Sequence, residues 1–110
     1  MTLLTTQTIA DTGTVAAPQA AASSDTINID SLGSYGFLEV INGGGSTDNV
    51  TIVDSGISPA GNLGTSDVVA VAAGTTKKIR IRRELADASS IVTVLHSFVT
   101  SVTENLWRVA

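Results

Sequence analysis

The 110-residue chain has no cysteine, few aromatic residues and fewer positive than negative charges. Without cysteine, a disulfide framework and a thiolate metal site are both excluded. The net charge of −4 argues against nucleic acid as a partner. No apolar run approaches the roughly 20 residues of a membrane helix, which argues against a membrane as a partner. The first residues lack the basic and apolar regions of a secretory signal, so we expect synthesis in the cytoplasm.

Val, Ile and Thr are abundant, and apolar residues alternate with polar ones in several short runs. β-Branched side chains fit the pleated surface of a sheet and lose rotamer freedom in a helix. About seven expected strands cover residues 26–29, 37–41, 49–53, 68–72, 77–83, 91–99 and 102–109. This close spacing predicts a single all-β domain, an antiparallel β-sandwich, with jelly-roll-like and barrel-like arrangements both open.

The start of the chain differs in composition from the rest, so we divide it into an extended N-terminal arm (1–24) and a β-sandwich domain (25–110). Residues 11–24 are small and polar without apolar periodicity, which is typical of a flexible linker. The preceding run "TLLTTQTIA" predicts a short strand that needs a partner. We expect it to join the sheet edge of a sister copy or another protein, and the domain to fold without it. The apolar residues expected at this contact are Leu3, Leu4 and Ile9.

Three consecutive glycines, Gly43, Gly44 and Gly45, lie between two expected strands. A phosphate-binding loop needs a helix after its glycines, because the N–H groups at the start of that helix bind the phosphate. Here the strand pattern "NVTIV" follows instead. The glycines therefore predict a hairpin turn or bulge with at least one glycine at positive φ, and no nucleotide cofactor.

His96 is the only histidine, and a lone histidine acts as a general base only beside a positioned nucleophile and an orienting acid. No motif such as G-x-S-x-G surrounds a serine in this chain. We therefore predict an ordinary strand residue at His96, no catalytic residue, and a protein that is not an enzyme.

Aspartates are spread along the chain and coincide with expected strand ends and turns, where the side chain bonds nearby backbone groups. Among them are Asp25, Asp30, Asp48, Asp54 and Asp67. They do not have the spacing of an EF-hand, so the sequence predicts no metal site.

Trp107 and Arg108 form an aromatic–cation pair near the end of the chain. Exposed, they would resemble an interface anchor. A half-buried tryptophan that seals the end of a sandwich is the alternative, and both interpretations stay open.

Five of the six positive side chains fall in the run "KKIRIRR", residues 77–83. In a strand, Ile79 and Ile81 would share the core face, because successive side chains point to opposite faces. The cations expected on the other face are Lys78, Arg80 and Arg82. Charges on an edge strand can prevent unwanted strand pairing. Alternatively, these side chains dock onto an acidic patch of a partner, since arginine holds carboxylates in bidentate fashion.

Three segments, "FLEVINGGGSTDNVTI", "VVAVAAGTTKKI" and "VTVLHSFVTSVTENLWRV", resemble a family of small structural proteins of tailed bacteriophages, especially those of actinobacteria, encoded with the major capsid protein. The matching residues are Phe37, Leu38, Val40, Asn42 to Gly45, Val69, Val71, Ala73 to Thr75 and Val99 to Thr103. The resemblance covers residues 35–110. It departs at "RIRRELADASS", where members often have an apolar, proline-rich segment.

The resemblance implies a β-sandwich that decorates the capsid or serves as a minor head protein. The expected function is that of a virion structural protein on the outer surface of the major capsid shell, which it stabilises. The expected partners are the major capsid protein and further copies of this chain, for example in a trimer. A head–tail connector or tail protein is one alternative, and a carbohydrate-binding β-sandwich module is another.

Overall fold

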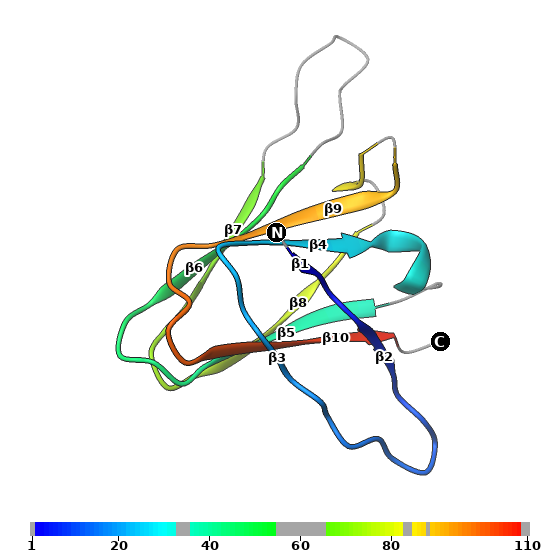
Figure 1. Cartoon of the computed structure of the whole chain (residues 1–110), viewed down its shortest axis with the longest axis horizontal. Coiled ribbons are helices and arrows are strands. Elements are labelled where there is room, and N and C mark those ends of the chain that lie inside the picture. The colour runs from blue at the N-terminus through cyan, green and yellow to red at the C-terminus, as the bar shows by residue number, and fades with distance from the viewer. Residues whose placement is uncertain (1, 33–35, 55–65, 83–84, 88, 109–110) are drawn as a thin grey trace, which may run out of the picture.

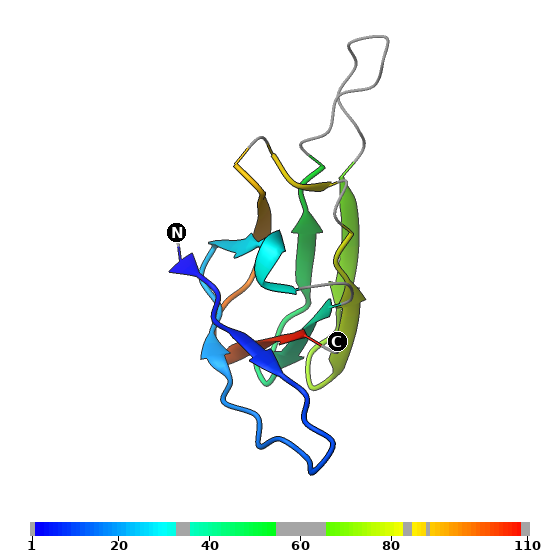
Figure 2. The ribbon, with the colours of Figure 1, turned by 90° about the vertical axis from the view of Figure 1, so that its right-hand side faces the viewer.

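The computed structural model describes residues 2–32, 36–54, 66–82, 85–87 and 89–108. These residues form two β-sheets that pack face to face (Figure 1), and no α-helix occurs among them. Figure 2 shows the two layers from the side. The prediction of an all-β sandwich is therefore confirmed.

The described part of each sheet contains five strands. Sheet A has the order β1 (Thr2–Leu3), β4 (Ser24–Asn28), β9 (Ile91–His96), β6 (Asp48–Ile52) and β7 (Asp67–Val71). Sheet B has the order β2 (Thr6–Thr8), β10 (Val102–Arg108), β5 (Gly36–Asn42) and β8 (Thr76–Arg80), and β3 (Gln19–Ala20) also pairs with β10. A short 3-10 helix, η1 (Ile29–Leu32), follows β4.

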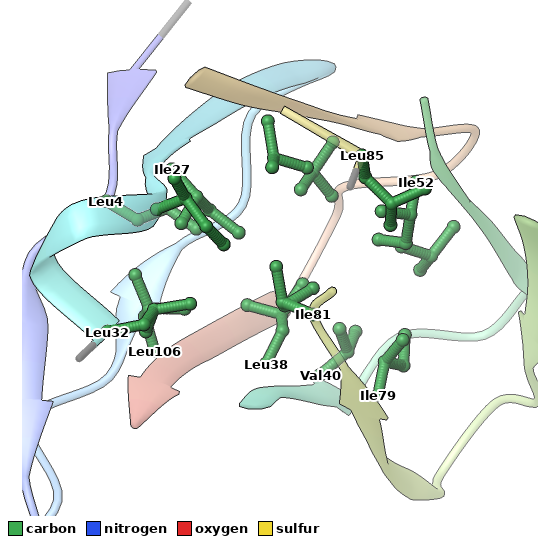
Figure 3. Close-up of a cluster of buried hydrophobic side chains, with 14 of the residues drawn as sticks. Leu4, Ile27, Leu32, Leu38, Val40, Ile52, Ile79, Ile81, Leu85 and Leu106 are labelled. Atoms are coloured by element: carbon green, nitrogen blue, oxygen red, sulfur yellow. The ribbon is translucent and has the colours of Figure 1, made fainter. Parts of the chain in front are cut away.

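Alternation along the strands builds the core. On β5, for example, Leu38 and Val40 are fully buried while Glu39 between them faces outward. Side chains from both sheets meet in this way in the space between them (Figure 3). All seven expected strands are present, although β8 and β9 end three residues earlier than the sequence pattern predicts.

The glycine loop is not a hairpin, and that prediction is wrong. The strand before it, β5, pairs with β8 and β10 in sheet B, whereas the strand after it, β6, belongs to sheet A. None of the three glycines has a positive φ. Gly44 instead packs so closely on the Thr100 carbonyl oxygen and the Phe98 ring that a Cβ atom would clash with both. The loop therefore needs glycine for close approach, not for turn geometry.

The N-terminal segment pairs with strands of its own chain. β1 adds in parallel to β4, and β2 adds in parallel to β10, so the segment crosses from one sheet to the other (Figure 1). Between these strands Leu4 enters the core and is 4% exposed. Leu4 is therefore not available for a partner, in contrast to the expectation from the sequence, while Leu3 and Ile9 are exposed. The expected boundary at residue 24 falls inside the sandwich.

Candidate functional site

Four titratable side chains meet in the interior of the sandwich, and we call them the buried tetrad: Asp25, Asp48, His96 and Glu104. Their side chains are 0% exposed. The first three come from β4, β6 and β9 of sheet A, and Glu104 comes from β10 of sheet B. The tetrad therefore links the two sheets.

Strand alternation places these polar groups inside, because each lies two residues from an apolar core residue and so points to the same face. The apolar neighbours in phase are Ile27 on β4, Val50 on β6, Val94 on β9, and Val102 and Leu106 on β10. His96 ends the pattern Val92-x-Val94-x-His96. That phase was the signal in the sequence that could have placed His96 in the core.

His96 is the centre of the tetrad. Its Nδ1 lies 2.6 Å from Oδ2 of Asp48, and its Nε2 lies 2.8 Å from Oε2 of Glu104. Oδ2 of Asp25 is 3.7 Å from the same Nε2. Two carboxylates thus face one ring nitrogen, and a third faces the other.

The carboxylates differ in how their remaining oxygens are satisfied. Oδ1 of Asp48 accepts a hydrogen bond of 3.0 Å from the Ser97 backbone N–H and a second from the next residue. Oδ1 of Asp25 and Oε1 of Glu104, in contrast, have no hydrogen-bond partner among the described residues. A buried acceptor without a partner is costly, so these two oxygens need an explanation.

The electrostatics of the tetrad follow from burial and contact. Burial by itself lowers the pKa of His96, but the hydrogen bonds and charges of Glu104 and Asp48 outweigh it and raise the pKa to about 9. Burial raises the pKa of Glu104 to about 7; Asp25 adds to this shift and His96 opposes it. A charged imidazole is therefore surrounded by three carboxyl groups, of which Glu104 keeps its proton to a higher pH than an exposed glutamate does.

The structure corrects two interpretations of these residues. His96 is a buried, ion-paired centre rather than an ordinary strand residue. Asp48 does not bond nearby backbone, because its hydrogen bonds reach 49 positions along the chain to Ser97. One ligand atom from each of Asp25, His96 and Glu104 lies within 4.8 Å of the others, so these three side chains could hold a metal ion.

A second polar cluster lies on the outward face of sheet B, and we call it the outer cluster. Oε1 of Glu39 accepts hydrogen bonds from Asn105 Nδ2 (2.9 Å) and Trp107 Nε1 (3.3 Å). Gln7 of the N-terminal segment donates to Oδ1 of Asn105 at 2.9 Å, and Lys78 lies 3.6 Å from Glu39. The outer cluster therefore fastens the N-terminal segment to the sheet.

Trp107 belongs to this cluster and is 7% exposed, so the interpretation as an exposed interface anchor is wrong. Its ring contributes to a groove of about 370 Å³ between the N-terminal segment and sheet B. The groove is lined by Ile9, Thr14, Ala16, Phe37, Glu39, Lys78 and Trp107. Because the ring is covered, it offers little surface on which a sugar could stack.

The basic run places its side chains as predicted. Ile79 and Ile81 are buried, which confirms their core face, and Lys78 and Arg80 are exposed on the other face. β8 is an edge strand of sheet B.

The cations of this run differ in their partners. Lys78 pairs with Glu39, and the partly exposed Arg82 forms an ion pair of 3.0 Å with Asp67 at the start of β7. Among the described residues, nothing forms a hydrogen bond or ion pair with the side chain of Lys77 or Arg80. A partner could therefore use these two cations without breaking an ion pair between described residues.

Comparisons with known proteins found no relative: no protein-family model, no curated protein and no solved structure matches the chain. In the described part of the chain, no helix has the length and apolar character needed to cross a membrane.

Proposed function

We propose that this chain is a non-enzymatic structural protein of a tailed-phage particle, bound to the outer surface of the major capsid shell. The resemblance of residues 35–110 suggests the partner. The observation that carries the proposal is the exposed cationic edge at β8, where Lys77 and Arg80 lack ion-pair partners among the described residues. Such an edge suits an acidic patch on the shell.

Charge alone would not hold the protein on the shell. Solvent-exposed ion pairs contribute only about 0–1 kcal/mol each, so the cationic edge orients the protein while apolar burial supplies most of the affinity. Leu3 and Ile9 are 58% and 41% exposed and offer apolar surface on the N-terminal segment. Burial of this apolar surface where neighbouring capsid subunits meet would stabilise the shell.

The enclosure of the tetrad supports a structural function. A general acid or base must reach its substrate directly or through one water. The side chains of His96 and its three carboxyl neighbours are 0% exposed, so in this conformation they face each other and not a substrate.

A binding experiment with purified shells that lack this protein tests the proposal. The double variant Lys77→Ser with Arg80→Ser removes two positive charges from the β8 edge. The control, Thr47→Glu with Thr100→Glu, makes the same change in net charge at exposed loop positions. We expect the first to weaken co-sedimentation with shells by about tenfold, and binding of the unchanged protein to weaken as salt rises. Equal losses in both variants, or binding indifferent to salt, would leave only the interpretation that these charges prevent unwanted strand pairing at the edge.

Copy number tests the location. Quantitative mass spectrometry of purified virions should find this protein at a copy number comparable to that of the major capsid protein. A few copies per particle would indicate the head–tail connector or the tail, and its absence from virions would overturn the proposal.

A further inference from the structure

The buried tetrad has more acidic groups than basic ones in a place where water cannot compensate a charge. Asp25, Asp48 and Glu104 surround a single imidazole, and all four side chains are 0% exposed. Isolated charges in a protein interior are paired, neutralised or bound to a metal, because desolvation is otherwise too costly. The tetrad therefore needs added positive charge, as protons or as a cation.

Two oxygens indicate where that charge is missing. Oδ1 of Asp25 and Oε1 of Glu104 have no hydrogen-bond partner among the described residues, although Asp25 is 0% and Glu104 is 1% exposed. In metal-free protein, burial and a hydrogen bond with Asp25 favour a proton on Glu104. A cation between the two carboxyl groups would replace that proton and satisfy both oxygens.

The orientation of the imidazole suits a metal ligand. Asp48 lies 2.6 Å from Nδ1 and is itself held by the Ser97 backbone N–H. It can therefore accept a hydrogen bond from Nδ1–H and keep the proton on that nitrogen. When the Nε2 proton leaves, this nitrogen presents a lone pair toward Glu104 and Asp25. A carboxylate on the far nitrogen of a metal-binding histidine is the usual arrangement around zinc.

We propose that Asp25, His96 and Glu104 bind a divalent transition-metal ion of the Zn²⁺ class between the two sheets, with Asp48 as the positioning residue. Ligands about 2.0–2.2 Å from a tetrahedral zinc ion lie about 3.3–3.6 Å from one another. The Nε2 distances to Glu104 and Asp25, 2.8 and 3.7 Å, lie on either side of that range. Small shifts of these side chains would therefore bring all three ligands to zinc, and the second carboxylate oxygens or a water would supply the fourth position.

The ligand types select the metal. One imidazole nitrogen with two carboxylates suits zinc and its transition-metal neighbours. Ca²⁺ requires six to eight oxygen ligands and Mg²⁺ keeps several waters, which a buried site with two carboxyl groups does not supply. Binding would release the protons held at Nε2 and on Glu104, so affinity should rise with pH.

Metal loading during refolding tests the site, since a buried ion enters as the chain folds. The full chain is unfolded in guanidinium chloride with EDTA, freed of both, and refolded with Zn²⁺, Mg²⁺ or Ca²⁺. Bound metal is measured by mass spectrometry after desalting, together with the thermal midpoint. We expect about one zinc ion per chain and a rise in midpoint of about 5 °C or more, without a comparable effect of Mg²⁺ or Ca²⁺.

Variants assign the metal to the tetrad. Asp25→Asn and Glu104→Gln keep the shape of the side chains but remove one ligand charge, and each should abolish zinc retention and the rise in midpoint. Asp11→Asn, on the exposed part of the N-terminal segment, is the matched control and should retain both. If the two tetrad variants retain zinc, or if Asp11→Asn loses it equally, the zinc is bound at the surface and the proposal is overturned.

A measurement on the unchanged protein covers the case in which a variant does not fold. His96 is the only histidine, so its imidazole nitrogen signals are unambiguous in NMR spectra. Zinc should shift the Nε2 signal strongly and leave a protonated Nδ1. Asp48→Asn should weaken zinc affinity by about 10–100-fold without changing the number of ions bound. An Nε2 signal that does not respond to zinc would contradict the site directly.

Discussion

The buried tetrad and the outer cluster both place a cationic side chain beside carboxylate oxygens, but in different surroundings. The tetrad has three carboxyl groups and the outer cluster has one, and each cluster joins elements far apart in the chain. In the tetrad every side chain is 0% exposed, whereas in the outer cluster Lys78 is 64% and Glu39 is 17% exposed. Water compensates an imperfect charge balance outside but not inside, so the same substitution should have different effects in the two clusters.

The clusters also connect different parts of the molecule. The tetrad joins sheet A to sheet B through Glu104, and Asp48 accepts hydrogen bonds from the connection between β9 and β10. The outer cluster joins the N-terminal segment to sheet B through Gln7. Loss of the tetrad should therefore affect the whole sandwich, and loss of the outer cluster should free only the segment.

The largest difference is expected when the cation of each cluster is replaced by leucine. In metal-free protein, His96→Leu leaves buried carboxylates without a counter-charge and should lower the free energy of unfolding by about 3–5 kcal/mol. Lys78→Leu removes one exposed ion pair and should cost about 0–1 kcal/mol. Urea titrations in EDTA measure both values. Similar losses in the two variants would show that burial does not distinguish the clusters.

The next effect is a pH dependence confined to the tetrad. The pKa of His96 is raised from 6.5 to about 9 in the folded protein, so its contribution is complete below pH 6.5 and is lost as the pH rises to about 9. The pKa of Glu104 is raised from 4.5 to about 7, so the folded state retains a proton that the unfolded state releases in that range. Both shifts make stability fall as the pH rises.

The groups that face His96 are Asp25 on β4, Asp48 on β6 and Glu104 on β10. Urea midpoints of metal-free protein between pH 5 and 9 should therefore decline, and His96→Gln should flatten the upper half of the profile. Glu39→Gln in the outer cluster should keep the decline. A flat profile for the unchanged protein would contradict the charged state of His96.

A smaller effect is expected at the glycine loop, which supports the tetrad from outside. Gly44→Ala places a Cβ atom against the Thr100 carbonyl and the Phe98 ring, in the connection that also supplies the Ser97 N–H to Asp48. Overpacking of this kind costs about 1–3 kcal/mol. At Gly45 a Cβ atom meets nothing within 4 Å, so Gly45→Ala should change stability by less than about 0.5 kcal/mol. Thermal unfolding distinguishes the two, and equal effects would reject close approach as the reason for glycine.

The smallest effect is expected from the link between the outer cluster and the N-terminal segment. Gln7→Ala removes the hydrogen bond to Asn105 and another from the Ala17 backbone N–H, and should cost about 1 kcal/mol. Hydrogen exchange should speed up in β2 and leave the amides of β9 unchanged. Faster exchange throughout both sheets would mean that the two clusters are not independent.

Local alternation explains what could be read from the sequence. The seven strands, the all-β class and the inward direction of Ile79 and Ile81 depend on neighbours two positions away, which any short stretch of chain displays. The phase that buries His96 was visible for the same reason, in Val92-x-Val94-x-His96, but one strand does not reveal what lies opposite.

Long-range pairing decided the rest. Whether the glycine loop joins partners in one sheet or crosses between sheets depends on β8, β9 and β10, which follow much later in the chain. The sequence of the N-terminal segment is typical of a linker, because its strands pair with distant elements of the same chain that local sequence does not reveal. The tetrad exists only when Asp25, Asp48 and Glu104 converge on His96, because burial turns scattered polar residues into one coupled electrostatic unit.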